Sequence, residues 1–199
     1  MHKAVISATG VYTPELSISN AELVEAFNAW ASAENARNAP RIESGEMEAI
    51  GLSSEEFIVK ASGIERRYVL NKSGVLDPKV MHPVLPERGD DEISVMAEMA
   101  VSAANEALGK AGKSAADIDG VICAASNHER AYPAIAIEVQ QALGIKGFGF
   151  DMNVACSSAT FAIQTAVHMV RAVSARAILI VDPEICSAHL EWRDRDCHF

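Results

Sequence analysis

The stretch Gly149-Phe-Asp-Met-Asn-Val-Ala-Cys156-Ser-Ser-Ala-Thr-Phe-Ala162 decides how the rest of the chain is interpreted. The residues before Cys156 have the character of a strand, and the residues after it begin an apolar helix with small side chains. Cys156 is therefore predicted to lie at a strand-to-helix junction, where backbone N–H groups and the helix dipole favour the thiolate. Because the thiolate is the nucleophilic form, Cys156 is a candidate covalent catalyst.

A regular alternation of strands and helices surrounds this junction. Apolar runs predict strands, and helical periodicity with glycine stops predicts helices. The strands are expected at Ile118–Ala125, Gly147–Met152 and Ala177–Val181, and the helices at Ile93–Ala111, Pro133–Leu143 and Ser157–Val173. This alternation predicts an α/β fold with a parallel sheet. The last helix is apolar nearly all round, which predicts that it is buried between layers and that Cys156 lies at the end of a tunnel.

The first ninety or so residues are less regular. A short strand is expected at Val5–Ala8. The capping-box patterns Ser19–Glu22 and Ser53–Glu56 predict two helix starts, the second helix ending at Gly63. A strand is expected at Arg66–Leu70. Two segments are interpreted as insertions or caps because one is polar and weakly periodic and the other is rich in Pro and Gly: Trp30–Gly51 and Asn71–Asp91.

Composition restricts the class of protein. The chain has 199 residues, 49% of them hydrophobic and 22% charged, which is usual for a globular α/β protein. A net charge of -10 argues against nucleic acid or an anionic membrane as the main partner. No stretch has the pattern of a signal peptide or the length of a membrane span. The four cysteines form no C-x-x-C pair, so reduced thiols in the cytoplasm are expected, and the spacing of His, Asp and Glu predicts no metal site.

Each candidate catalytic cysteine or histidine can also be interpreted as a purely structural residue. A free cysteine is usually a small buried hydrophobe, and this is the prediction for Cys123 and Cys186. A cysteine nucleophile normally needs a histidine base. His168 falls on the apolar helix and is expected to be a core residue, while His128 follows a buried strand without a local link to Cys156. The residues alone therefore indicate a nucleophile without a base.

Several segments together resemble the β-ketoacyl-acyl carrier protein synthase III family of thiolase-like condensing enzymes. The matching segments occur in the family's order over most of the chain: Gly63-Ile-Glu-Arg-Arg, the run from Tyr132 to Gly144, Phe150-Asp-Met-Asn-Val-Ala-Cys-Ser, and Asp194-Arg195. The segments Trp30–Gly51 and Asn71–Asp91 resemble additions found in a branch primed by medium-chain acyl-CoA such as octanoyl-CoA. The resemblance implies the N-terminal half of a layered αβαβα fold over residues 1–199, with the C-terminal half absent and the isolated half unstable.

The resemblance also assigns roles to individual residues. Cys156 matches the acyl-accepting nucleophile, whose own N–H helps to form an oxyanion hole. Arg195 matches a contact to the adenine end of coenzyme A, and Ser53 and Phe57 match positions beside the pantetheine and adenine. Ala61 stands where the family often has a coenzyme-binding arginine, which is a departure from the pattern. Tyr132 matches an aromatic residue that reaches the acyl pocket of a dimer partner.

The implied reaction is a decarboxylative condensation of an acyl-CoA with malonyl-acyl carrier protein, in a cytoplasmic homodimer that serves fatty acid synthesis. No metal or other cofactor is implied beyond the coenzyme A thioester. The family completes its site with a His and an Asn that have no match in this chain. Two alternatives remain open: a related acyl-CoA transferase, such as a 3-hydroxy-3-methylglutaryl-CoA synthase-like or secondary-metabolite enzyme, and a non-catalytic partner subunit of a condensing enzyme.

Overall fold

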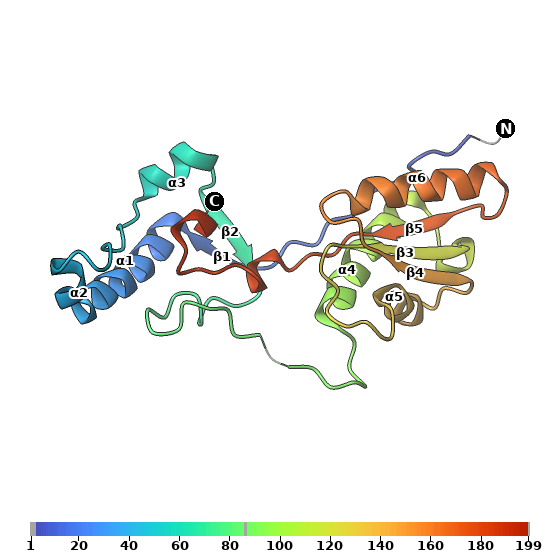
Figure 1. Ribbon diagram of the computed structural model, residues 1–199. Helices are drawn as coiled ribbons and strands as arrows, with labels where there is room; N and C mark the ends of the chain where they lie inside the picture. Colours follow the sequence, from blue (N-terminus) through green and yellow to red (C-terminus); the bar gives the residue numbers. More distant parts are fainter. Residues whose placement is uncertain (1–2, 86, 199) are drawn as a thin grey trace. The chain divides into compact units, whose positions relative to one another are not determined.

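The computed structural model describes residues 3–85 and 87–198 (Figure 1). Pro86, which belongs to the predicted excursion 71–91, lies outside the described residues, as do residues 1–2 and 199. The chain divides into two compact units, and each is described by itself. Unit 1 comprises Met1–Tyr12 and Arg88–Ile185, and unit 2 comprises Thr13–Glu87 and Cys186–Phe199.

Unit 1 contains a three-stranded parallel sheet. The strands are β3 (Gly120–Ala124), β4 (Phe148–Met152) and β5 (Ile178–Val181), in the order β4-β3-β5. Every residue of β3 is buried, because β3 has a strand on each side and helices on both faces. The three strand predictions in this region are confirmed, and no strand end differs by more than two residues.

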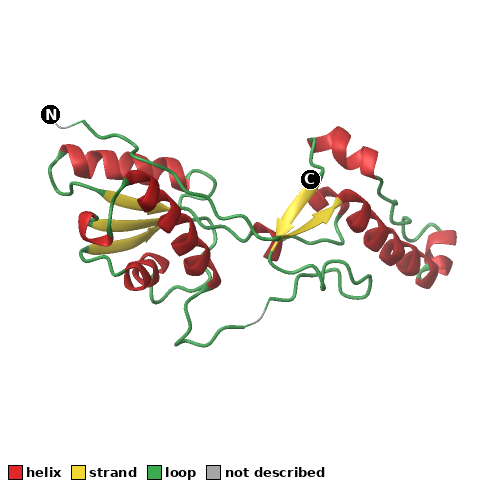
Figure 2. Ribbon diagram, turned by 180° about the vertical axis from the view of Figure 1, so that it is seen from behind, coloured by secondary structure: helices red, strands yellow, loops and turns green. Residues whose placement is uncertain are grey.

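Helices cover the two faces of this sheet (Figures 1 and 2). Helix α6 (Ser158–Arg171) packs on one face, and α4 (Val95–Ala111) and α5 (Ile135–Leu143) cover the other. Gly112 and Gly144 end α4 and α5 with φ of 61° and 72°, a left-handed conformation that glycine adopts without strain. A 3-10 turn, Ala115–Asp117, follows α4. The predicted helices of this unit are thus confirmed.

A buried polar contact joins α4 to α5. The Ser94 hydroxyl caps α4 by accepting from the Ala97 N–H at 3.2 Å. Glu138 on α5 accepts from the Ser94 hydroxyl at 2.6 Å and from the Ser94 N–H at 3.0 Å. Arg130 lies 3.8 Å from the same carboxylate. The charge of Glu138 is therefore buried with partners, as a buried carboxylate requires.

Unit 2 combines a two-stranded antiparallel ribbon with helices. The ribbon pairs β1 (Leu16–Ser19) with β2 (Arg66–Val69). Its helices are α1 (Asn20–Arg37), α2 (Ala39–Glu43) and α3 (Glu55–Ser62), with 3-10 turns at Cys186–Ala188 and Arg195–His198. The ribbon and α1 enclose a hydrophobic core, in which Trp192 and Phe27 are the largest fully buried side chains. The segment 186–198 thus returns to pack with residues far from it in sequence.

The Ser19–Glu22 capping box is present and starts α1 as predicted. The Lys72 ammonium, 2.5 Å from the Glu22 carboxylate, and the Ser19 N–H at 2.9 Å lower the pKa of Glu22 to about 2. Helix α1 continues to Arg37, into the segment Trp30–Gly51 that was interpreted as an insertion. Polar side chains on the exposed face of α1 weaken the periodic signal there without preventing a helix.

Two predictions of local structure are wrong. Ser54, one residue after the predicted Ser53, caps α3 by accepting from the Phe57 N–H at 3.1 Å. Val5–Ala8 forms no strand, and Val5 and Ile6 are 80% and 71% exposed. The residues just after this segment lie against α4, where a Cβ on Gly10 would be 2.0 Å from the Ala103 carbonyl oxygen. The edge strands β4 and β5 pair with β3 alone, so this segment is not part of the described sheet.

Among the residues that the structure describes, no helix combines the length and the apolar character needed to cross a membrane.

Buried His198 should make the stability of unit 2 depend on pH. Burial lowers the pKa of its imidazole, whose Nε2 lies 3.0 Å from the Trp192 carbonyl oxygen. The unfolded chain binds this proton more readily, so stability is full above about pH 6.5 and falls below it. We expect urea unfolding, followed through the fluorescence of Trp30 and Trp192, to show a lower midpoint at about pH 5.5 than at about pH 7.5.

His198→Gln should reduce this pH dependence, whereas His82→Gln, at an exposed position of the same unit, should leave it unchanged. An equal pH dependence in wild type and His198→Gln would contradict the assignment.

Candidate active site

Cys156 lies in the connection between β4 and α6, where the sequence places it, and its side chain is exposed. The N-cap residue of α6 is Ser157, so the thiol precedes the helix by two residues. The first-turn N–H groups of a helix lack intrahelical partners, and the helix dipole adds partial positive charge there. The predicted junction is therefore confirmed as a position, and its local field favours an anion.

Ser158 holds the loop that carries Cys156. Its buried hydroxyl accepts from the Val154 N–H at 2.8 Å and donates to the Ala155 carbonyl oxygen at 2.7 Å. Ala155 has a φ of 48°, which is unfavourable for a residue with a Cβ. The Asn153 side chain stabilises this turn by accepting from the Ala155 N–H at 3.0 Å. The loop before the thiol is thus fixed by side chains on both sides of it.

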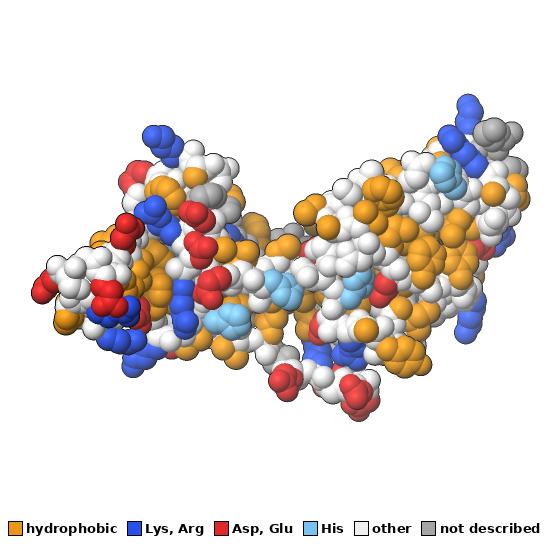
Figure 3. Space-filling model, viewed as in Figure 1, with side chains coloured by type: hydrophobic (Ala, Val, Ile, Leu, Met, Phe, Trp, Pro, Cys, Tyr) orange, Lys and Arg blue, Asp and Glu red, His pale blue; other side chains and the backbone are white. Residues whose placement is uncertain are grey.

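The prediction of a tunnel around Cys156 is wrong for the described residues. Only Ser158 and Ala162 of α6 are buried, and Phe161 and Ile163 are 51% and 41% exposed. Figure 3 shows hydrophobic side chains on the surface of the unit that contains α6. The physical reason is that α6 packs on a single face of a three-stranded sheet, which leaves its outer side uncovered.

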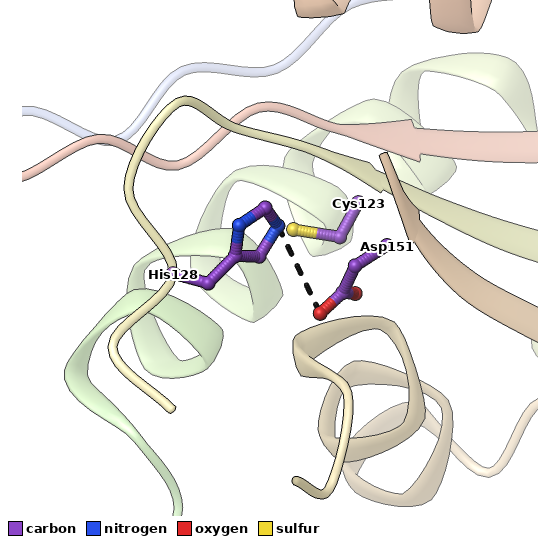
Figure 4. A group of neighbouring side chains, drawn as sticks. All are labelled: Cys123, His128 and Asp151. Atoms are coloured by element: carbon purple, nitrogen blue, oxygen red, sulfur yellow. Dashed lines mark ion pairs between the residues drawn. The ribbon is translucent and has the colours of Figure 1, made fainter. Parts of the chain in front are cut away.

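Neither histidine considered as a base is placed beside Cys156 by an observed contact. His168 is exposed and lies 2.8 Å from the Gln164 side chain, so its assignment to the core is wrong. His128 is directed instead toward Asp151 and Cys123 (Figure 4).

Cys123, His128 and Asp151 form a cluster at the carboxyl ends of β3 and β4. Their ligand atoms all lie within 4.8 Å of one another, and His128 Nε2 is 3.8 Å from an Asp151 oxygen. Burial, followed by the charges of Asp151, Asp182 and Glu184, raises the pKa of the Cys123 thiol. The buried position of Cys123 confirms its prediction, whereas Cys186 is exposed in a 3-10 turn, so its core assignment is wrong.

Sequence spacing did not indicate this cluster because its members come from three segments. Cys123 and Asp151 are opposite each other in the β3–β4 register, so their side chains point to the same side of the sheet. His128 reaches them from the loop after β3. The available signal was that each of two predicted parallel strands carries a possible metal ligand, Cys123 or Asp151, next to its last residue. The cluster can hold a metal ion, which the sequence did not predict.

The three residues matched to coenzyme A lie together in unit 2. The Arg195 guanidinium stacks 4.4 Å from the centre of the Phe57 ring and donates to the Leu52 carbonyl oxygen at 3.1 Å. Ser53 follows Leu52 directly, and its buried hydroxyl has no hydrogen-bond partner. A pocket of about 460 Å³ lies beside Arg195, lined also by Phe27, Ile50, Gly51, Glu191, Arg193, Asp194 and Asp196.

Two amides of α1 hold the chain segment at this pocket. Asn28 bonds both to the N–H of Ser53, at 2.8 Å, and to its carbonyl oxygen, at 3.0 Å. Asn35 makes the same pair of bonds to Ile50, at 2.8 and 2.9 Å. The two asparagines are seven residues apart and therefore share one face of the helix. Sequence reasoning missed them, although this spacing of amides in a helix is a usable signal.

The two remaining positions matched to the family, Tyr132 and Ala61, are both exposed. Tyr132 is 91% exposed, so its ring is available to another molecule. Ala61 lies on α3 and is exposed, so it leaves room where an arginine would stand. The contacts of these two residues do not test the roles that the resemblance implies for them.

Comparison with known proteins agrees with the motifs. The family described as 3-oxoacyl-[acyl-carrier-protein (ACP)] synthase III matches residues 150–199. A β-ketodecanoyl-[acyl-carrier-protein] synthase of Pseudomonas aeruginosa is 61% identical over 88% of this chain and 50% of its own length. A β-ketoacyl-[acyl-carrier-protein] synthase III of Granulibacter bethesdensis is 30% identical over 98% of this chain and 47% of its own. The chain spans about half the length of the curated relatives it matches.

Solved structures support the same fold. The 3-oxoacyl-[acyl-carrier-protein] synthase III of Aquifex aeolicus matches with a TM-score of 0.71 and 23% identity, over 98% of this chain and 49% of that one. The corresponding enzyme of Pseudomonas aeruginosa gives 0.70 and 21%, over 98% and 47%. The mixed α/β fold of this chain is therefore that of one half of a thiolase-like condensing enzyme.

Replacement of Ser158 should loosen the Cys156 loop. Ser158→Ala leaves the Val154 N–H and the Ala155 carbonyl without this partner, and we expect a loss of about 1–3 kcal/mol in the free energy of unfolding. Urea denaturation followed by circular dichroism measures the change.

Ser157→Ala is the matched control, because Ser157 is exposed and its side chain makes no capping hydrogen bond. Equal stability losses in the two variants would refute the role given to Ser158.

Proposed function

We propose a function from one premise: over the residues it comprises, this chain belongs to the β-ketoacyl-[acyl carrier protein] synthase III family. The proposed activity is a decarboxylative condensation of an acyl-CoA with malonyl-acyl carrier protein. The observation that supports it best is the exposed Cys156 at the start of α6, in a chain 61% identical to a synthase of this kind.

In the first step, the Cys156 thiolate attacks the thioester carbonyl of the acyl-CoA. The carbon–sulfur bond to coenzyme A breaks, coenzyme A leaves as its thiolate, and the acyl group stays on Cys156 as a new thioester. The N–H groups at the start of α6 are suited to stabilise negative charge on the carbonyl oxygen during this step. The thiol and the N–H groups that this half-reaction uses both lie in this chain.

In the second step, malonyl-acyl carrier protein loses carbon dioxide and its enolate attacks the acyl thioester. The new carbon–carbon bond forms as the Cys156 thiolate is expelled, which restores the enzyme. The family pattern assigns stabilisation of the enolate to a His and an Asn, for which we propose residues outside this chain. The enzyme would therefore need a second half to complete condensation.

We propose an eight-carbon acyl group as the primer. The Pseudomonas aeruginosa relative is named for a β-ketodecanoyl product, and condensation with a malonyl group lengthens the acyl chain by two carbons. An octanoyl thioester is the donor that this arithmetic requires. The identity of 61% over most of the chain supports carrying this chain length over.

The nucleotide end of the acyl-CoA is proposed to bind at Arg195, Phe57 and Ser53. Arg195 and Phe57 offer a cation and a ring at 4.4 Å from each other, which suits stacking and contact with an anionic nucleotide. The unpartnered hydroxyl of Ser53 offers a hydrogen bond to a polar group of the pantetheine. The adjoining pocket of about 460 Å³ has the volume for a small ligand group.

The assembly is proposed to be a cytoplasmic homodimer of full-length subunits, with Tyr132 contributing to the acyl pocket of the partner. Its exposure of 91% supports a role at such an interface. The uncovered side of α6 is proposed to pack against the half of the enzyme that lies outside this chain. The condensation itself is proposed to require no cofactor besides the coenzyme A thioester.

The alternatives from the sequence are less well supported. A non-catalytic subunit has no need of an exposed thiol at a helix start. A 3-hydroxy-3-methylglutaryl-CoA synthase-like or secondary-metabolite transferase would use the same cysteine with another acceptor. The two curated relatives considered above are named as β-ketodecanoyl- and β-ketoacyl-[acyl-carrier-protein] synthases, which favours malonyl-acyl carrier protein as acceptor.

Acyl transfer can be tested by mass spectrometry of the intact protein with octanoyl-CoA. We expect one octanoyl adduct in wild type and its loss in Cys156→Ala. Cys186→Ala is the matched control, since Cys186 is another exposed thiol and its loss should leave the adduct in place. An adduct that persists in Cys156→Ala would reject Cys156 as the acceptor.

The nucleotide site can be tested by comparing two acyl donors. Arg195→Ala removes the cation over Phe57, which should weaken octanoyl-CoA binding by about 1 kcal/mol, or roughly fivefold. The dependence of adduct formation on donor concentration should shift for octanoyl-CoA and stay unchanged for octanoyl-N-acetylcysteamine, which has no nucleotide.

Arg41→Ala removes an exposed arginine elsewhere in the same unit and should affect neither donor. A shift of similar size for both donors in Arg195→Ala would disprove a nucleotide contact.

A further inference from the structure

We propose that Cys123, His128 and Asp151 form a binding site for a divalent transition-metal ion such as Zn²⁺, separate from the chemistry of Cys156. Their sulfur, nitrogen and oxygen atoms converge within 4.8 Å of one another. Thiolate, imidazole and carboxylate together are a ligand set that Zn²⁺ uses, and the thiolate and imidazole disfavour Mg²⁺ and Ca²⁺. The proposal does not depend on the condensing activity.

The geometry is near that of a metal site. Ligand distances of about 2.0–2.3 Å around Zn²⁺ place neighbouring ligand atoms about 3–4 Å apart. His128 Nε2 and the nearer Asp151 oxygen, at 3.8 Å, already meet this requirement. Cys123 and Asp151 occupy paired positions of β3 and β4, and His128 belongs to a loop, so side-chain rotations and a small loop movement can close the set from the present separations of at most 4.8 Å. Three protein ligands leave a fourth position for water.

The carboxylate is already oriented for this role. The backbone N–H groups of Ile135 and Ala136, at the start of α5, each donate to one Asp151 oxygen at 2.9 Å. Supporting hydrogen bonds of this kind fix the orientation of metal ligands. Asp151 therefore presents its remaining lone pairs toward His128 and Cys123 rather than rotating freely.

Hydrogen bonds among the side chains at this cluster do not satisfy all of their buried polar atoms. His128 Nε2 is buried without a hydrogen bond, and so is one oxygen of the nearby Glu184. A buried polar atom without a partner is costly, and a cation at this point would satisfy Nε2 directly. The carboxylates of Asp182 and Glu184 act on the same thiol and add negative charge around the position of the ion.

A Cys-His-Asp hydrolase triad is the competing interpretation, and the geometry argues against it. In such a triad the thiol and the carboxylate contact opposite nitrogens of the imidazole. In Figure 4 the Cys123 sulfur and the Asp151 carboxylate both lie on the Nε2 side of the ring. Cys123 is also fully buried, so no substrate can reach it. Convergence on one point is the arrangement that a metal ion requires.

Metal binding replaces the proton of the Cys123 thiol. The ion gains a metal–sulfur bond, and the thiol proton passes to the buffer, so no oxidant or reductant takes part. Bound metal would connect the ends of β3 and β4 to the loop that follows β3. It would stabilise the folded state in proportion to its occupancy.

The test uses Co²⁺ as a spectroscopic probe in Cys156→Ala protein, which lacks the exposed nucleophile. We expect one equivalent of Co²⁺ to give a thiolate-to-cobalt charge-transfer band that Zn²⁺ abolishes. Cys123→Ala and His128→Gln should each remove the band or weaken binding at least about tenfold. Zn²⁺ should also raise the thermal unfolding midpoint of the parent but not of His128→Gln.

Matched controls are Cys186→Ser and His168→Gln, which change an exposed cysteine and an exposed histidine and should leave the band intact. His128→Gln alters a loop residue, so it remains informative if Cys123→Ala fails to fold. The proposal is overturned if folded Cys156→Ala protein shows no charge-transfer band. It is overturned equally if His128→Gln gives the same band with unchanged affinity for Co²⁺.

Discussion

Parallel pairing of β4 and β5 to the buried strand β3 is the constraint on which unit 1 depends. Parallel strands end at one common edge, so the segments that follow them meet there. The loop with Cys156 follows β4, the loop with His128 follows β3, and Asp182 and Glu184 follow β5. The hydrogen bond from the Asn153 amide to the Ser126 carbonyl oxygen, at 2.8 Å, joins two of these loops directly. The two hydrogen-bond ladders of β3 thus concentrate the chemistry of this unit at one edge.

Unit 2 obtains its order from side chains more than from a sheet. Its ribbon has only eight residues in strands, and the segment at the pocket is held by the amides of Asn28 and Asn35. Burial of Trp192, Phe27 and His198 then brings residues 186–198 onto α1. The contact between Arg195 and Phe57 follows from this packing, because it needs the end of the chain to lie beside α3.

Local sequence was sufficient for the elements of unit 1 and for the position of Cys156, because periodicity and glycine stops act within a few residues. Prediction from local sequence failed where contacts with residues distant in the chain determine the structure. Ser53 and Ser54 both offer a capping hydroxyl, and Asn28 selects Ser54 by holding the backbone of Ser53. The cluster at Cys123 depends on the register between two strands, and the exposure of α6 depends on how many layers cover it. Neither the strand register nor the number of covering layers can be predicted from a local sequence pattern.

Strand β4 has a consequence for handling the protein. It stands at the margin of the described sheet, and all five of its residues are only partly buried. An edge strand of this kind presents unpaired backbone groups and the side chains of Phe148 and Phe150 to a strand of another molecule. Self-association through this margin is second order in protein, so the soluble yield of this chain should fall with rising expression level. Charge repulsion from the net -10 opposes this process, and added salt weakens that protection.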